Sequence, residues 1–173
     1  SPYPPAQLHA ATEAVLADSG VAWTALRYGF FGNLDDLLGP WQQTGTIAKP
    51  ADGPLPWSDR ADLAEAAAVV LTSDGAFDGP VTLVPPGAVT LDDFARAASE
   101  VTGRTIERVV VDDEQWVAEQ IANGIPEPLA RFTLSMFQAT RTGHYAQGDP
   151  LLTELLGREP RSIADLLADE IRP

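Results

Sequence analysis

Apolar positions along the chain follow both helical and strand-like spacings. Leucine, valine and alanine recur every three or four residues from 6 to 18 and predict an amphipathic helix. The apolar run Val21–Arg27 predicts a buried strand, and Val81–Val84 predicts a second, shorter one. Between them, an alanine-rich stripe from 63 to 71 predicts a helix that begins at Asp59. This order predicts one parallel strand–helix–strand unit.

The rest of the chain is predicted to be mostly helical. Three pairs have the spacing of capping boxes, in which a residue at the helix start and one three positions later bond reciprocally: Thr90 with Asp93, Asp112 with Gln115 and Ser162 with Asp165. The stretch 39–56 is rich in Gly and Pro and is predicted to be irregular, with an extended piece over 46–49. A strand is expected over 105–111. Further helices are expected over about 34–38 (capped by Asn33), 90–102, 112–124, 126–143, 149–156 and 162–171, after a proline-rich lead-in over 1–5.

One strand–helix–strand unit is too little for a doubly wound sheet, because a parallel sheet needs several strands and both faces covered. The pattern is that of the second part of an α/β domain followed by a helical cap. One face of the helix after residue 126 is expected to carry Leu129, Phe132, Thr133, Met136 and Phe137. Of these, Met136 and Phe137, together with Trp41 and Trp57, either line an apolar pocket or belong to the core.

The composition and charge of the chain disfavour several classes of function. The chain of 173 residues has 11 basic and 25 acidic residues, a net charge of -14. Nucleic-acid and anionic-membrane partners are therefore not expected, since both need clustered Lys and Arg. The chain has no cysteine, which fits a cytoplasmic protein, and we expect neither a membrane span nor a signal peptide. Two histidines without cysteine do not favour a metal site, and no G-x-S-x-G turn supports a serine hydrolase.

The stretch Trp23–Asn33 is the most informative part of the chain. In open α/β sheets, ligands bind beyond the carboxyl ends of the strands. Tyr28, Phe30, Phe31 and Asn33 would lie there. Two intervening glycines would let the backbone approach another group closely. From spacing alone, this stretch is either a ligand-binding loop or an ordinary aromatic loop after a core strand.

Several motifs occur in order along the chain from His9 to Ser162. They are His9-x-x-x-Glu13, Trp23-Thr24-Ala25-Leu26-Arg27 with Gly29-x-Phe31 and Asn33, Asp62-Leu63-Ala64, Thr90-Leu91-Asp92-Asp93-Phe94-Ala95 with Thr102-Gly103-Arg104, and Gly157-Arg158-x-Pro160-Arg161-Ser162. Taken together, these motifs resemble the NmrA-like branch of the atypical short-chain dehydrogenase/reductase superfamily.

The resemblance implies a partial Rossmann-like parallel sheet with a helical substrate-binding cap. The division implied is a C-terminal part of a Rossmann-like domain over 1–88 and a helix-rich cap over 89–173. Such proteins open with a glycine-rich turn that holds the dinucleotide pyrophosphate, and no such turn is found in this chain. The N-terminal nucleotide-binding half is therefore expected to be absent. NADP or NAD is the cofactor of the full-length family, and binding by this chain alone is not expected.

The resemblance also assigns site residues. Tyr28, Gly29, Phe30 and Phe31 are implied to lie beside the nicotinamide. Substrate-binding residues are implied to be Phe31, Asn33, Trp57 and Phe137. Where short-chain dehydrogenases carry a Tyr-x-x-x-Lys pair, this chain has His9-x-x-x-Glu13. These two side chains share one helix face and form either a catalytic proton-exchanging pair or an exposed helical pair.

The function implied is the substrate side of an NAD(P)H-dependent oxidoreductase that reduces a quinone-like or other small carbonyl compound, inactive as this chain alone. The alternative is a non-catalytic NmrA-like module that senses the dinucleotide. Whether the chain is an enzyme stays open, because both the glycine-rich turn and the Tyr-Lys pair are missing. An unpaired strand edge predicts either a homo-oligomer or association with the missing N-terminal half.

Overall fold

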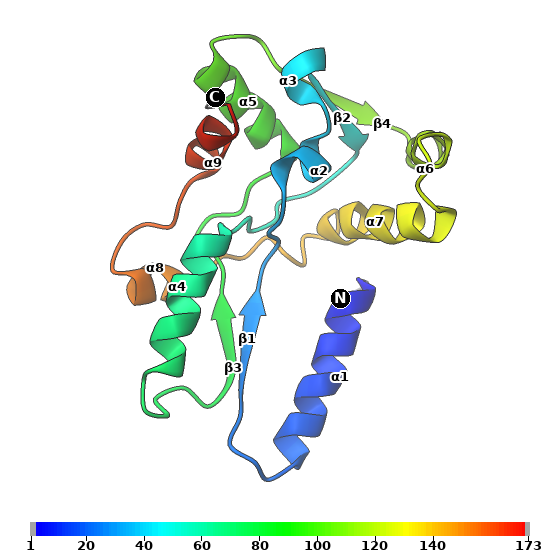
Figure 1. Ribbon diagram of the computed structural model, residues 1–173. Coiled ribbons are helices and arrows are strands. Elements are labelled where there is room, and N and C mark those ends of the chain that lie inside the picture. The colour runs from blue at the N-terminus through cyan, green and yellow to red at the C-terminus, as the bar shows by residue number, and fades with distance from the viewer. Residues whose placement is uncertain (1–2, 172–173) are drawn as a thin grey trace.

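The computed structural model describes residues 3–171 and contains two separate two-stranded parallel sheets with helices around them (Figure 1). Sheet β1–β3 forms the lower part of the view, and sheet β2–β4 lies above it. The elements are α1 Pro4–Asp18, β1 Thr24–Tyr28, α2 Leu34–Leu38, α3 Trp41–Thr44, β2 Thr46–Pro50, α4 Arg60–Leu71, β3 Gly79–Leu83, α5 Leu91–Thr102, β4 Glu107–Val111, α6 Asp113–Ala122, α7 Glu127–Thr140, α8 Leu151–Leu156 and α9 Ile163–Glu170.

The predicted strand–helix–strand unit is present. Strands β1 and β3 pair in parallel with Leu26 opposite Val81, and α4 connects them through the chain. The predicted stripe of α4 is buried at Leu63, Ala66 and Val70, where small and branched side chains pack against the sheet. It ends before Leu71, which is 82% exposed. The apolar cluster between them also includes two leucines of α8, and its buried members are Leu63, Ala66, Val70, Val81, Leu83, Leu152 and Leu156.

The second sheet, β2–β4, was not predicted as a pair, although both of its strands were expected. The buried side chain of Arg108, on β4, links the two strands of this sheet. Its guanidinium donates to the carbonyl oxygens of Lys49 at 2.9 Å and Pro50 at 2.6 Å, and it forms an ion pair with Asp52 at 3.3 Å. Asp52 in turn accepts from the backbone N–H of Leu91 at 2.8 Å. The buried pair therefore joins the start of α5 to β2.

Two expectations near the start of the chain were wrong. The strand after α1 begins at Thr24, and it is half exposed, not buried. Helix α1 begins at Pro4, within the predicted lead-in, whose first two residues lie outside the described chain. Proline is favoured in a first helical turn, where its missing N–H has no intrahelical partner. No α1 residue is buried among the described residues, and Leu8 and Val15 are 67% and 70% exposed.

Two further expectations were wrong in detail. The stretch predicted to be irregular contains the short helix α3, because Trp41 packs with no exposed surface into the larger apolar cluster. In α7 the buried face carries Ala130, Leu134 and Phe137, whereas Phe132 is 44% exposed. The larger cluster joins residues of α2, α3, α5, α6, α7 and α9. No helix in the described part of the chain is long and apolar enough to cross a membrane.

Candidate functional site

The chain segment that leaves β1 lies directly beside the segment that leads into α4. Phe30 donates its N–H to the Pro56 carbonyl at 3.0 Å and accepts from the N–H of Ser58 at 2.8 Å. Gly29 makes this approach possible, because a Cβ there would lie 2.6 Å from the Pro56 oxygen. The predicted close approach at this glycine is therefore made by the chain itself. It brings Trp57 to the carboxyl end of β1.

Two helices begin at this end of β1. Asn33 caps α2 by accepting from the N–H of Asp35 at 2.8 Å, as predicted. Asp59 caps α4 by accepting from the N–H groups of Ala61 and Asp62 at 2.9 and 3.2 Å. Both caps follow the usual preference for short polar side chains that satisfy free N–H groups at helix starts. The two starts form neighbouring walls of one cavity.

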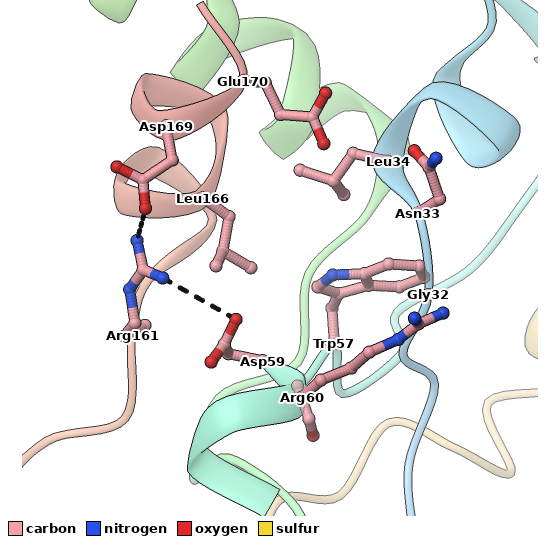
Figure 2. Close-up of a pocket in the computed structure, with 11 residues that line it drawn as sticks. Gly32, Asn33, Leu34, Trp57, Asp59, Arg60, Arg161, Leu166, Asp169 and Glu170 are labelled. Atoms are coloured by element: carbon pink, nitrogen blue, oxygen red, sulfur yellow. Dashed lines mark hydrogen bonds and ion pairs between the residues drawn. The ribbon is translucent and has the colours of Figure 1, made fainter. Parts of the chain in front are cut away.

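The cavity has a volume of about 490 Å³, within the range of small-molecule sites. Figure 2 shows the Trp57 indole between the α4 and α2 walls, with Leu34 and Leu166 beside it and α9 closing the far side. The ring is fixed by an edge-to-face contact with Phe94 at 5.9 Å. The lining residues are Gly32, Asn33, Leu34, Trp57, Ser58, Asp59, Arg60, Arg161, Leu166, Asp169 and Glu170.

The α9 wall is held in place by Asp62, a side chain with no exposed surface in the first turn of α4. Its Oδ2 accepts from the backbone N–H of Arg161 at 2.7 Å, and its Oδ1 forms an ion pair with Arg158 at 2.8 Å. The Arg161 guanidinium then bonds Asp169 and lies 3.8 Å from Asp59. One buried carboxylate thus connects α4 to the segment that carries α9.

Glu170 and Arg60 face the cavity without an oppositely charged side-chain partner among the described residues. Burial and, to a lesser extent, the nearby Asp35 carboxylate raise the pKa of Glu170 above its usual value. The Arg60 guanidinium lies 6.0 Å from the centre of the Phe31 ring, a cation–π distance. Figure 2 shows the two charged groups on opposite sides of the Trp57 indole.

Ser58 lines the cavity and is 2% exposed, yet its hydroxyl has no hydrogen-bond partner within the described chain. An unsatisfied buried hydroxyl lowers stability, so Ser58→Ala should stabilise the protein by about 1 kcal/mol. Urea unfolding followed by circular dichroism measures this change. A destabilised Ser58→Ala variant would show instead that the hydroxyl is bonded in the native protein.

The sequence-predicted substrate residues do not all meet. Asn33 and Trp57 line the cavity. Phe31 is not among the lining residues, but its ring lies under the guanidinium of Arg60, which is. Phe137 is buried in the core, where its ring contacts Trp116 at 5.8 Å. The sequence analysis missed the charged lining residues of α9, although the motif before that helix, Gly157 to Ser162, is one of the pieces that resemble the family.

The residues expected beside the nicotinamide point in two directions. Tyr28 and Phe31 contact each other edge to face at 6.0 Å. The Phe30 ring instead contacts Tyr145 at 5.2 Å and Tyr3 at 6.0 Å. The structure thus places an aromatic cluster that includes residues of the chain start and of the segment after α7 beside the end of β1.

His9 and Glu13 lie on α1 and are not part of the cavity. The Glu13 carboxylate accepts from Arg27 Nε at 2.8 Å and also from Nη2 of the same side chain. The hydrogen bond from Arg27 is the main cause that lowers the pKa of Glu13. The Glu13 carboxylate therefore connects α1 to β1, while the His9 side chain is exposed.

Two positions near the end of β1 do not offer a pyrophosphate site. Gly29 is packed against Pro56, and the start of α4 is already capped by Asp59. Neither position leaves free N–H groups at a glycine-rich turn, which a pyrophosphate needs. Between residues 3 and 171, no group of three or more acidic, histidine or cysteine side chains is arranged to hold a metal ion.

No family profile matches the chain. Quinone oxidoreductase 2 of Escherichia coli is 26% identical over 167 residues, which are 95% of this chain and 58% of that protein. The NmrA-like oxidoreductase flvB of Aspergillus flavus is 27% identical over 157 residues, 88% of this chain and 51% of that protein. The crystal structure of the E. coli quinone oxidoreductase with NADPH superposes with a TM-score of 0.87 at 25% identity, over 99% of this chain and 62% of that one.

The fold and these matches define a Rossmann-like α/β protein with part of an NAD(P)-dependent oxidoreductase architecture. Over most of its length the chain is similar to an NmrA-like oxidoreductase and to a quinone oxidoreductase. It spans about half the length of the curated relatives that it matches. The structure of the negative transcriptional regulator NmrA with NADP has the same fold, at 18% identity and a TM-score of 0.62.

Proposed function

We propose that this chain forms the substrate side of an NAD(P)H-dependent oxidoreductase that reduces a quinone-like or other small carbonyl compound. The observation that carries the proposal is the cavity at the carboxyl end of β1, bordered by Asn33 and Trp57. Open α/β sheets bind ligands at this end. A flat indole with two leucine side chains beside it suits a small apolar ring system, and the charged rim would orient its polar atoms.

We further propose that the chain does not catalyse reduction alone. Gly29, at the carboxyl end of β1, is packed against Pro56 and offers no cradle for the pyrophosphate. The cofactor would then be held mainly by residues outside this chain, and the chain would supply the substrate cavity. We also propose that His9 and Glu13 take part in proton exchange. Because Glu13 is hydrogen-bonded to Arg27, His9 is the member of the pair that would exchange the proton.

The test is a chimera in which this chain replaces the matching portion of the E. coli quinone oxidoreductase. The isolated chain and the chimera are each titrated with NADPH by nicotinamide fluorescence, and NADPH absorbance is then followed with 1,4-naphthoquinone. The isolated chain should bind no NADPH at millimolar concentration and show no turnover. The chimera should bind NADPH and oxidise it only when quinone is present.

Each outcome decides one part of the proposal. Saturable micromolar NADPH binding by the isolated chain would contradict a substrate-side role, because the chain would then contain its own nucleotide site. A chimera that binds NADPH without quinone-dependent oxidation would favour the dinucleotide-sensing alternative. NADPH binding also reports whether the chimera has folded, so a folding failure is recognised before turnover is measured.

The open side of sheet β1–β3 predicts association. In the described chain β1 pairs only with β3, and Leu8, Val15 and Val21 nearby are each about two-thirds exposed. Exposed strand edges and apolar surface promote pairing with another chain. The isolated chain should therefore form dimers or larger species at high concentration in analytical ultracentrifugation. A single monomeric species across the concentration range would contradict this expectation.

A further inference from the structure

Strand β4 lies at the periphery of the molecule, next to β2 (Figure 1). Within the described residues it pairs with β2 alone. On the side of β2, Glu107 donates its N–H to the Gly45 carbonyl at 2.9 Å. Because backbone groups alternate in direction along a strand, the N–H and C=O groups of Arg108 and Val110 point to the other side. The outer side of β4 can therefore form hydrogen bonds with a further strand.

The side chains beside this outer edge are apolar and exposed. Val110 is 63% exposed and Val109 is 41% exposed. As neighbours in the strand they point to opposite faces of the sheet, so an added strand would cover both. Natural edge strands are often protected by proline or lysine, and β4 contains neither. The Arg108 side chain offers no such protection, because it is buried toward β2.

The two ends of β4 carry charges of opposite sign. The exposed Arg104 precedes the strand and donates to the Gln42 carbonyl at 2.7 Å, and the exposed Asp112 follows the strand and caps α6. In an antiparallel pair, the start of one strand lies beside the end of the other. Two copies of β4 paired in this way would bring Arg104 of each copy near Asp112 of the other. Parallel pairing would instead place like charges together, so the charges favour an antiparallel pair.

From these observations we propose that two copies of the chain associate through their β4 strands, which pair antiparallel and join the two β2–β4 sheets into one. The arrangement has twofold symmetry, and each copy contributes the same surface. Each copy has a net charge of -14, but physiological salt screens repulsion between charges more than about 8 Å apart. The surface is separate from the cavity and from sheet β1–β3, so the inference does not depend on the proposed function.

The test is cross-linking through an introduced cysteine, since the chain has none of its own. Val109→Cys places a thiol near the centre of the proposed pair, where opposed side chains are close enough for a disulfide. With copper phenanthroline as oxidant, in about 0.15 M salt, the isolated chain should form a covalent dimer on non-reducing gel electrophoresis. The control is Leu71→Cys, at an 82% exposed position of α4, which should cross-link at least tenfold more slowly.

Two matched pairs of variants, each made in the Val109→Cys chain, test the edge and its charges. Val110→Lys puts a charge beside the outer edge and should slow cross-linking at least tenfold, whereas Leu71→Lys should not. Arg104→Glu should slow it severalfold, because the facing strand ends would then repel each other. Arg96→Glu changes the net charge equally on α5 and should leave the rate unchanged. Urea unfolding shows whether each variant is folded.

Equal rates for the Val109→Cys and Leu71→Cys variants would overturn the proposed dimer, and so would equal effects of Val110→Lys and Leu71→Lys. Equal effects of Arg104→Glu and Arg96→Glu would overturn the antiparallel arrangement. Association through the open side of sheet β1–β3 would not bring the two copies of β4 together, so the cross-link reports on β4 alone. The proposed function is judged separately, by NADPH binding and turnover of the chimera.

Discussion

Gly29→Ala should destabilise the protein by about 3 kcal/mol, the upper end of the cost of overpacking. A Cβ at this position would lie 2.6 Å from the Pro56 carbonyl oxygen and 3.1 Å from a methyl group of Val84. The first neighbour is backbone and cannot rotate away, so the two segments must separate. Their separation would break the hydrogen bonds that Phe30 makes with Pro56 and Ser58. Urea unfolding followed by circular dichroism measures the loss.

Gly32→Ala is the matched control, three residues further along the same loop. The nearest atom to a Cβ there is Cη2 of Trp57 at 3.7 Å, an ordinary contact distance. The backbone of Gly32 is also compatible with other residues, because it does not have a positive φ. The control should therefore change stability by no more than about 0.5 kcal/mol. Similar losses for both variants would show that the loop, and not the contact with Pro56, determines the effect.

Asp62→Ala should cost about 3 kcal/mol and loosen the wall of the cavity that α9 forms. The carboxylate has no exposed surface, and it accepts a hydrogen bond from the backbone of Arg161. Hydrogen bonds to charged groups contribute more than neutral ones, and their loss leaves the partner N–H unsatisfied. Exchange of the backbone amide hydrogens should become faster in α9 and change little in α5. Denaturant unfolding gives the total loss of stability.

The control for Asp62→Ala is Glu65→Ala, one turn along the same helix. Glu65 forms an ion pair with the same Arg158 at 2.6 Å, but both side chains are about half exposed. Exposed ion pairs contribute little to stability. Its removal should therefore leave hydrogen exchange in α9 unchanged. Faster exchange in α9 after Glu65→Ala would assign the connection to Arg158 and not to the backbone hydrogen bond of Asp62.

Local signals in the sequence predicted much of the fold. The capping boxes at Thr90 and Ser162 are both present with their reciprocal bonds, and Asn33 and Asp59 cap the helices expected of them. Such caps are readable because the interaction joins residues two or three positions apart. The strand–helix–strand unit was readable for a related reason, since its helix has a continuous small-residue stripe.

The structural predictions were wrong where contacts between residues distant in the sequence determine the local structure. Nothing near Arg108 in the sequence shows that its guanidinium is buried against β2, roughly sixty residues earlier along the chain. The burial of α1 was overestimated because its apolar spacing says nothing of whether a partner surface is present. The face of α7 was misassigned because Phe132 and Leu134 both satisfy a helical stripe, and only contact with α6 distinguishes them.

The site was predicted only in part, because some of its residues come together from distant parts of the sequence. Asn33 and Trp57 were found because they follow or lead into elements at the carboxyl end of β1. Glu170 and Asp169 were missed because they lie more than 110 residues after Trp57 in the chain and reach the site only through the placement of α9. Their signal was the Arg158-to-Ser162 motif, whose contact with Asp62 sets the direction in which α9 begins.

The two parallel sheets also bear on how the chain folds. Each pairs strands that are more than fifty residues apart in sequence, Thr24 with Gly79 and Thr46 with Glu107. Such pairing closes a long loop before it gains any contact, so it is slow compared with helix formation. The capped helices α4 and α5 should therefore form early, and both sheets late. During that interval four strand segments remain unpaired, and a newly made chain is then most exposed to aggregation.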